Sequence, residues 1–76
     1  MLFKLPKITK GEDSAVVTNW HVKSDERVKK DQDIVEVSTD KATFDVASPC
    51  DGVLKKILKR TGDDVRSGEI IAEIEQ

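Results

Sequence analysis

The chain holds few of the residues on which catalysis, metal binding or nucleic-acid recognition usually depends. Its 76 residues include one cysteine, Cys50, and one histidine, His21, so neither an internal disulfide nor a cluster of thiolate ligands can form. Two phenylalanines and one tryptophan are too few for a platform on which bases stack. The formal net charge of −2 lacks the basic excess typical of nucleic-acid-binding and membrane-surface domains. A single cysteine fits a reducing compartment.

Sequence motifs of common catalytic sites are absent as well. The sequence contains no G-x-S-x-G, Walker loop, C-x-x-C or H-E-x-x-H. His21, in NWHVK, is interpreted as a surface residue, and Cys50, in SPCDG, as an unreactive loop or strand-end residue. No apolar run has transmembrane length, and the N-terminal MLFKLPK lacks the apolar region of a signal peptide. We therefore expect no enzymatic activity from this chain by itself.

The hydrophobic residues that are present favour an all-β fold. Valine and isoleucine dominate short runs such as AVV, IVEV and EIIAEI, and polar turns such as KSDER and RTGDD separate the runs. Several short strands at close spacing predict a β-sandwich or barrel. The segment 53–60, VLKKILKR, could instead form a helix with Val53, Ile57 and Leu58 on one face. The turn residues that bound this segment favour a strand.

An internal repeat divides the chain into two similar halves. Residues 14–39 align with residues 51–76 without a gap, each residue matching the one 37 positions later. The matched pairs include Val16 and Val53, Val17 and Leu54, Val28 and Val65, Ile34 and Ile71, Glu36 and Glu73, and Val37 and Ile74. Each half is too small to bury a core alone, so we expect two sheets packed face to face about a pseudo-two-fold axis.

The segment 36–46, EVSTDKATFDV, predicts a hairpin with Asp40 and Lys41 at its tip. This register sorts the side chains by polarity, because successive residues of a strand point to opposite faces. The predicted cross-strand pairs are Val37 with Phe44 and Val35 with Val46 on the apolar face, and Glu36 with Asp45 and Ser38 with Thr43 on the polar face. The repeat places Lys41 at the end of the domain opposite the C-terminus.

Two features of this hairpin, the Glu36–Asp45 pair and Lys41, have more than one interpretation. Glu36 opposite Asp45 places like charges across two strands, which costs stability. The pair is either a solvated face or an acidic patch for a partner enzyme. Lys41 is one of ten lysines, and a turn lysine can simply aid solubility.

Several short motifs are spread along nearly the whole chain: LPKI, G, WHVK, STDKA, DGV and the ending GDDV with GEIIAEIE. Together they resemble the lipoyl domain of the acyltransferase component of 2-oxo acid dehydrogenase complexes. The matching residues of the first region are Leu5, Pro6, Ile8, Gly11, Trp20, Val22 and Lys23. The chain departs from the family pattern at Thr9 and Lys10, and again at residues 24–26, where the family usually has a turn glycine. Asp25 can serve there because aspartate tolerates a positive φ.

The resemblance implies a flattened β-barrel or sandwich of two four-stranded sheets, with the modified lysine at a hairpin tip. Lys41 would carry lipoic acid in amide linkage, and Asp40 and Ala42 would flank it for turn geometry and recognition. The implied partners are a lipoate–protein ligase or lipoyl transferase, a thiamine-diphosphate decarboxylase, the acyltransferase core and dihydrolipoyl dehydrogenase. The loop from Lys7 to Asp13 is either a contact for the decarboxylase or an ordinary variable loop. The isolated domain is expected to be a monomer.

Several alternatives remain open from the sequence. A biotin carrier shares the fold, but its lysine is usually flanked by methionines, and the only methionine here is Met1. The glycine-cleavage carrier is longer and has added helices. An unmodified interaction module would leave Lys41 as a plain turn residue. Among the complexes, STDKAT favours pyruvate and DGVLKKI the branched-chain 2-oxo acids, with 2-oxoglutarate as a further alternative; we predict pyruvate.

The resemblance also sets expectations for the parent protein. Residues 1–76 are expected to be the N-terminal domain of a longer acyltransferase, located in a bacterial cytoplasm or a mitochondrial matrix. Trp20 is expected to lie at least partly buried under a sheet.

Overall fold

The structure, a computed structural model, describes residues 1–6 and 14–76, and all the regular secondary structure in these residues is β-strand. The strands are β1 (Leu2–Lys4), β2 (Ser14–Trp20), β3 (Arg27–Val28), β4 (Asp33–Ser38), β5 (Thr43–Ala47), β6 (Gly52–Ile57), β7 (Asp64–Arg66) and β8 (Ile70–Glu75). The helical alternative for residues 53–60 is wrong, because β6 runs through most of this segment. Within the described part of the chain, no helix has the length and hydrophobicity needed to cross a membrane.

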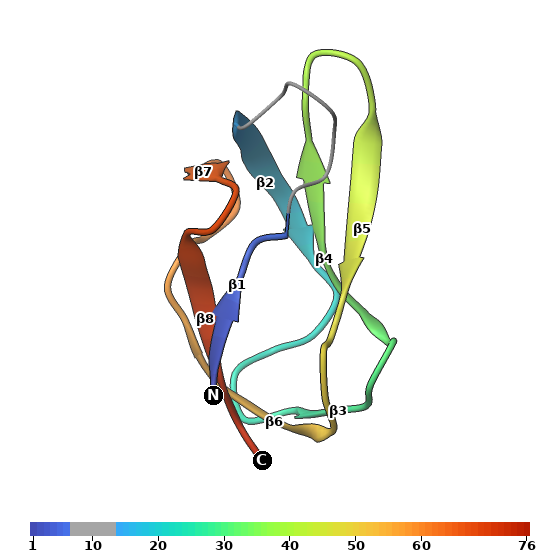
Figure 1. The fold of residues 1–76 in the computed structure, drawn as a ribbon, viewed down its shortest axis with the longest axis vertical. Helices are drawn as coiled ribbons and strands as arrows, with labels where there is room; N and C mark the ends of the chain where they lie inside the picture. The colour runs from blue at the N-terminus through green and yellow to red at the C-terminus, as the bar shows by residue number, and fades with distance from the viewer. Residues whose placement is uncertain (7–13) are drawn as a thin grey trace.

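The strands form two antiparallel four-stranded sheets, which confirms the expected sandwich (Figure 1). One sheet has the order β1-β8-β6-β3 and the other the order β5-β4-β2-β7. The repeat explains this topology, because β2, β3 and β4 match β6, β7 and β8 at the offset of 37 residues seen in the sequence. If each strand is replaced by its match, the order of one sheet becomes the order of the other. In this comparison β1 takes the place in its sheet that β5 takes in the other.

Hydrogen bonds in the turns repeat with the same offset. In each turn a side-chain oxygen accepts a bond from the backbone N–H three residues earlier. The matched bonds are Lys23 N–H to Glu26 Oε1 and Arg60 N–H to Asp63 Oδ2, then Lys29 N–H to Gln32 Oε1 and Arg66 N–H to Glu69 Oε1. Such bonds satisfy backbone donors locally, so different residue types build the same turn.

Positive φ angles occur at matched positions of the two halves. Among the described residues they are Asp25 (70°) with Gly62 (95°) and Asp31 (69°) with Gly68 (86°). Glycine adopts this conformation without steric cost, and aspartate tolerates it better than most residues. Asp25 therefore takes the place of the turn glycine, as expected from the sequence.

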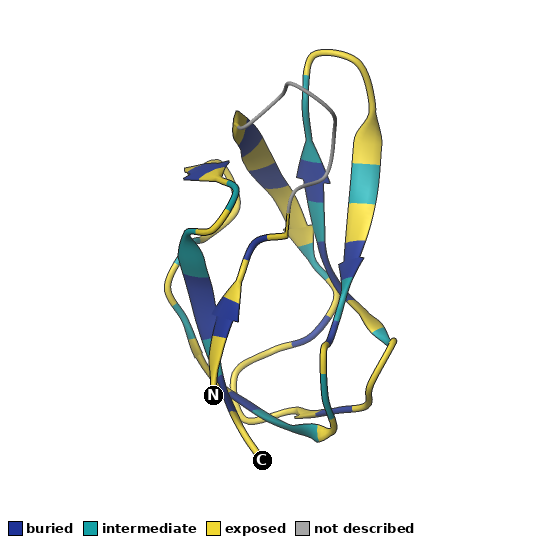
Figure 2. Ribbon diagram, in the orientation of Figure 1, coloured by how far each residue is buried: buried dark blue, intermediate teal, exposed yellow. Residues whose placement is uncertain are grey.

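The core lies between the two sheets and is built mainly from valine, isoleucine and leucine. Figure 2 shows buried residues recurring along β2, β4 and β8. Matched positions are buried alike: Val28 and Val65 have no exposed surface, and neither do Ile34 and Ile71. Trp20 is half-buried against this core, and its indole N–H donates to the carbonyl of Lys59 at 2.8 Å. The prediction of a partly buried Trp20 is confirmed.

The connection between β4 and β5 lies at one end of the long axis of the molecule, and both termini lie at the other (Figure 1). The backbones of Met1 and Ile74 are hydrogen-bonded, which ties the first strand to the last. The expectation that Lys41 lies opposite the C-terminus is confirmed, because Lys41 belongs to the β4–β5 connection.

Candidate functional site at the β4–β5 hairpin

The register of the β4–β5 hairpin is the one that the sequence predicted. The four predicted cross-strand pairs are all present: Val37 with Phe44, Val35 with Val46, Glu36 with Asp45, and Ser38 with Thr43. Val35, Val37 and Val46 are buried and Phe44 packs against the core. Because the apolar face of the hairpin is fixed by this packing, its tip has a defined position relative to the domain.

The tip is a two-residue turn formed by Asp40 and Lys41. The N–H of Thr39 donates to the carbonyl of Ala42 at 2.8 Å, and the Thr39 hydroxyl oxygen accepts bonds from the N–H groups of Lys41 and Ala42, both at 3.2 Å. Two-residue hairpins usually need positive φ angles, and neither Asp40 nor Lys41 has one. The Thr39 side chain therefore stabilises the turn in place of a glycine.

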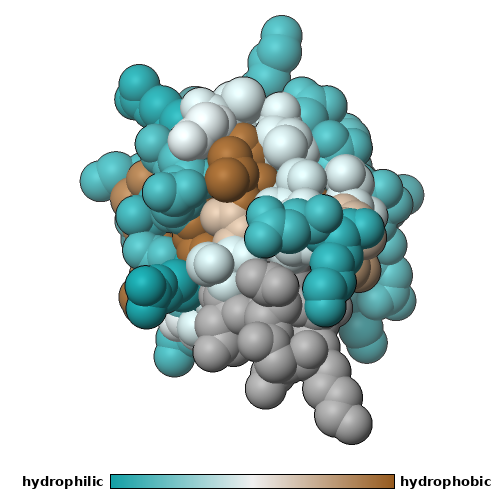
Figure 3. Space-filling model, turned by 90° about the horizontal axis from the view of Figure 1, so that it is seen from above, coloured by the Kyte–Doolittle hydropathy of each residue, from teal (hydrophilic) through white to brown (hydrophobic). Residues whose placement is uncertain are grey.

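Lys41 is exposed, together with Asp40, Ala42 and Thr43. None of the described carboxylates lies within ion-pair distance of the Lys41 ammonium group. Viewed from this end of the molecule, the surface is mainly hydrophilic around a small apolar area (Figure 3). The turn thus presents an accessible amine at the end of two well-packed strands.

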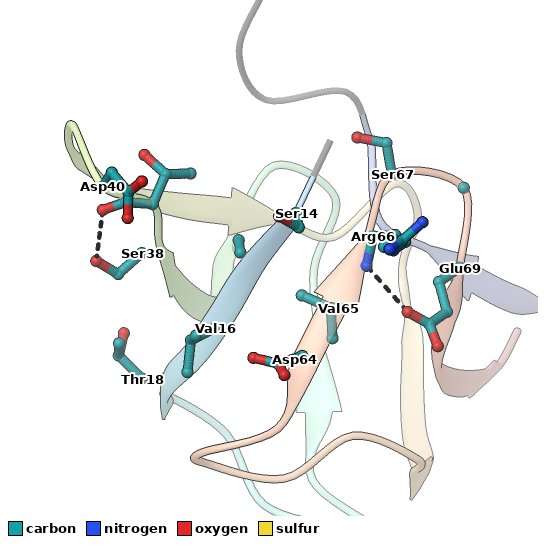
Figure 4. A pocket seen from close by; sticks show the side chains of 13 residues that line it. Ser14, Val16, Thr18, Ser38, Asp40, Asp64, Val65, Arg66, Ser67 and Glu69 are labelled. Atoms are coloured by element: carbon teal, nitrogen blue, oxygen red, sulfur yellow. Dashed lines mark hydrogen bonds between the residues drawn. The ribbon is translucent and has the colours of Figure 1, made fainter. Parts of the chain in front are cut away.

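An open groove of about 990 Å³ lies beside the tip (Figure 4). Its lining comes from Asp40 and the end of β4, from β2, and from the segment 64–69. Glu69, at one border, lies 2.9 Å from the Lys59 ammonium group. The hydrogen bond from Lys59, with that from the Arg66 backbone, lowers the pKa of the Glu69 carboxyl, and the bond to Glu69 raises the pKa of Lys59.

On the polar face of the hairpin, the structure adds a third side chain, His21, to the predicted pair of Glu36 and Asp45. The Nε2 atom of His21 lies 2.9 Å from Oδ1 of Asp45, and Glu36 lies beside both. His21 is exposed, which confirms the prediction of a surface residue. The register of β4 and β5 located Glu36 and Asp45. The pairing of β2 with β4, which the local sequence does not reveal, adds His21.

Two further sequence interpretations concern residues outside the β4–β5 hairpin. Cys50 is half-buried in the connection between β5 and β6, which agrees with its interpretation as a loop residue. The Lys7–Asp13 loop, considered as a contact for a decarboxylase, lies outside the described residues.

A profile of the family described as "Biotin-requiring enzyme" matches residues 2–74. The solution structure of the lipoyl domain of the 2-oxoglutarate dehydrogenase complex from Azotobacter vinelandii superposes with a TM-score of 0.77 at 36% sequence identity. That comparison covers 99% of this chain and 95% of the other. The chain belongs to the lipoyl domains. It is therefore a carrier domain and has no catalytic role of its own.

Other relatives of this lipoyl domain are larger proteins. The succinyltransferase component of the 2-oxoglutarate dehydrogenase complex from Cupriavidus necator is 39% identical over 72 residues, which are 95% of this chain and 17% of the relative. The chain spans less than a fifth of the length of the curated relatives it matches. Kluyveromyces lactis urea carboxylase shares the fold, with a TM-score of 0.76 at 20% identity, over 99% of this chain and 7% of its own.

Proposed function

We propose that Lys41 of this domain carries lipoic acid in amide linkage and serves a 2-oxoglutarate dehydrogenase complex. The observation that carries the proposal is an exposed lysine, flanked by Asp40 and Ala42, at the tip of a fixed hairpin in a lipoyl domain. The accessible amine suits acylation by an attaching enzyme. The interaction-module alternative gives no reason for this placement.

The chemistry asks little of the protein beyond presentation. The Lys41 ammonium group first loses a proton to solvent. Its nitrogen then attacks the carbonyl carbon of an activated lipoate, the amide bond forms, the activating group leaves with the electron pair of its bond, and the nitrogen releases a second proton. The product loses one positive charge, so the formal net charge of the chain changes from −2 to −3. When bound, the lipoyl group supplies the redox-active sulfurs, so the domain needs no second cysteine.

The turn geometry supports this role. Bonds from Thr39 order the backbone of Lys41 and Ala42, while the side chain of Lys41 remains exposed. A rigid base with a long flexible arm lets a partner recognise the domain while the reactive end reaches into an active site. Tethering raises the effective concentration of the arm at each site, so weak contacts with each partner suffice.

The choice of complex is revised relative to the sequence. The substring STDKAT favoured pyruvate, whereas the Azotobacter vinelandii and Cupriavidus necator proteins above belong to 2-oxoglutarate dehydrogenase complexes. The short motif at the turn serves attachment of the lipoyl group, which all these complexes require. It is therefore weak support for one 2-oxo acid substrate over another. Similarity over the whole domain supports the 2-oxoglutarate alternative.

The remaining partners and the parent protein belong to the same proposal. The domain would be the N-terminal part of a dihydrolipoyllysine acyltransferase and would exchange acyl groups and electrons with a thiamine-diphosphate decarboxylase, the acyltransferase core and dihydrolipoyl dehydrogenase. A lipoate–protein ligase or lipoyl transferase would attach the cofactor. We propose a monomeric domain in a bacterial cytoplasm or mitochondrial matrix.

The attachment site is tested by intact mass and peptide mapping after incubation with lipoate, ATP and a lipoate–protein ligase. We expect one lipoyl group on Lys41, and none on the Lys41→Arg variant. Lys30→Arg is the matched control, because Lys30 is also an exposed turn lysine next to an aspartate, and it should be modified like the parent. A folded parent chain that accepts no lipoate, or that is modified at another lysine, contradicts the proposal. Incubation with biotin ligase tests the biotin alternative.

The complex is tested by reductive acylation of the lipoylated domain. We expect a higher kcat/KM with the decarboxylase of a 2-oxoglutarate complex than with that of a pyruvate complex from the same organism. The opposite preference would restore the pyruvate assignment and leave the attachment site unaffected.

A further inference from the structure

Three potential metal ligands meet on the outer face of one sheet, below the hairpin tip. They are His21, directly after β2, Glu36 on β4, and Asp45 on β5. One ligand atom from each lies within 4.8 Å of the other two. The side chains of His21 and Asp45 keep 34% and 47% of their surface exposed, so an ion from solvent can reach them.

The positions of these side chains are fixed by the backbone. Glu36 and Asp45 are directly paired across β4 and β5, and β2 is paired with β4. The Thr18 hydroxyl donates to Glu36 Oε2 at 2.7 Å, which orients the carboxylate. Outer hydrogen bonds of this kind commonly hold metal-binding carboxylates in place.

The charges of this cluster are unbalanced when His21 is neutral. Two carboxylates then face each other across adjacent strands, which is destabilising, and the imidazole lies 2.9 Å from that of Asp45. A divalent cation would neutralise both carboxylates and accept the imidazole nitrogen as a ligand. Bonds of about 2.1 Å in tetrahedral geometry separate ligand atoms by about 3.4 Å, so small side-chain rotations are enough to form the site.

The pseudo-symmetry shows that the fold does not require this cluster. The matched positions in the other sheet are Leu58 for His21, Glu73 for Glu36 and, by strand pairing, Leu2 for Asp45. These three positions hold one carboxylate and two exposed leucines. The three ligands are therefore a feature of one half only, laid over a shared backbone.

We propose that His21, Glu36 and Asp45 bind one divalent cation of the zinc class, with water completing its coordination. One imidazole and two carboxylates suit zinc and neighbouring transition metals better than magnesium, which prefers oxygen ligands alone. The ion would join β2, β4 and β5 and so stabilise the hairpin that carries Lys41. This site is independent of the proposed lipoylation of Lys41.

The test is calorimetric titration of the 76-residue chain with zinc chloride, with nickel and magnesium chlorides for comparison. All variants carry Lys41→Arg, so that no lipoyl dithiol can bind the metal. We expect one zinc ion per chain, weaker or no binding of magnesium, and a higher Tm with zinc that EDTA reverses. Losing an outer-shell partner alone commonly weakens metal affinity about 10–100-fold, so His21→Gln and Asp45→Asn should each weaken zinc binding more than about tenfold.

Glu36→Gln and Glu73→Gln form the matched pair of variants. They change the same residue type at equivalent positions, so Glu36→Gln should weaken zinc binding and Glu73→Gln should not. Cys50→Ser removes the only thiol and should leave the affinity unchanged. Tm values in EDTA report whether each variant folds. Absence of saturable zinc binding to the folded parent, or equal affinities of His21→Gln and the parent, overturns the proposal.

Discussion

The two halves of the domain share a backbone but use it differently. Strands, sheet order, turn hydrogen bonds and buried positions repeat at an offset of 37 residues. The pair β4–β5 is closed by a turn that presents Lys41, whereas the matched pair β8–β1 consists of the last and first strands of the chain. The repeated features build the fold, and the features that occur once are the candidates for function.

A second difference concerns the residues that fill equivalent positions. Aspartates occupy two left-handed turn positions in the first half, where the second half has glycines. Ala15 of β2 matches Gly52 of β6, and Gln32 matches Glu69. Each of these pairs offers a substitution in one half whose expected result is already visible in the other.

The largest expected effect concerns the shared core. Ile34 and Ile71 are matched residues with no exposed surface. Replacing either by alanine should lower the free energy of unfolding by about 2–5 kcal/mol, because buried methyl groups are lost and a cavity remains. Urea denaturation of Ile34→Ala and Ile71→Ala measures both losses. A loss below about 1 kcal/mol at only one of them would show that the two halves contribute unequally to the core.

The second prediction concerns the close approach at Gly52. A Cβ atom at this position would lie 2.4 Å from the backbone oxygen of Glu75 and 2.8 Å from a methyl carbon of Ile74. Gly52→Ala should destabilise by about 1–3 kcal/mol, because backbone atoms must shift. At the matched position alanine is already present, so Ala15→Gly should cost only about 0.5–1 kcal/mol through added freedom of the unfolded chain. Thermal unfolding distinguishes the two; an unchanged Tm for Gly52→Ala would contradict the close approach.

These pairs show how far the sequence predicts the molecule. Strand identity, the register of EVSTDKATFDV and the position of Lys41 followed from alternating polarity and from the repeat, because both are local or periodic signals. The His21, Glu36 and Asp45 cluster did not, since it depends on the pairing of β2 with β4 across a long connection. The prediction of a pyruvate complex rested on residues near the tip, which reflect attachment rather than substrate, whereas the relatives support the proposed 2-oxoglutarate complex.

The third prediction concerns the left-handed turn positions. Apart from the adjacent residues, no atom of the described part of the chain lies within 4 Å of a Cβ built on Gly62 or Gly68, so the cost of Gly62→Ala or Gly68→Ala is conformational. A non-glycine residue in this region costs about 1–2 kcal/mol. Asp25→Gly places glycine at the position that matches Gly62 and should change stability by less than about 1 kcal/mol. Equal losses for Gly62→Ala and Asp25→Gly, measured by urea denaturation, would show that the matched turns differ in energy despite their similar φ angles.

The smallest expected effect is the pH dependence contributed by Lys59 and Glu69, whose matches in the first half, Val22 and Gln32, are uncharged. The hydrogen bond and charge of Lys59 lower the pKa of Glu69 below its usual 4.5, so this stabilisation is present above pH 4.5 and is lost as the pH falls through the lowered pKa. The raised pKa of Lys59 gives stability below pH 10.5 that is lost as the pH rises through the raised pKa.

Glu69→Gln should remove both contributions and keep the turn, because Gln32 accepts the equivalent backbone bond from Lys29 at 3.0 Å. Since both side chains are solvent-accessible, salt should reduce the difference between parent and variant. Urea denaturation from acid to neutral pH, at low and high salt, should show the two stabilities converging at acid pH. A constant difference across that range would assign the effect to the turn rather than to the ion pair.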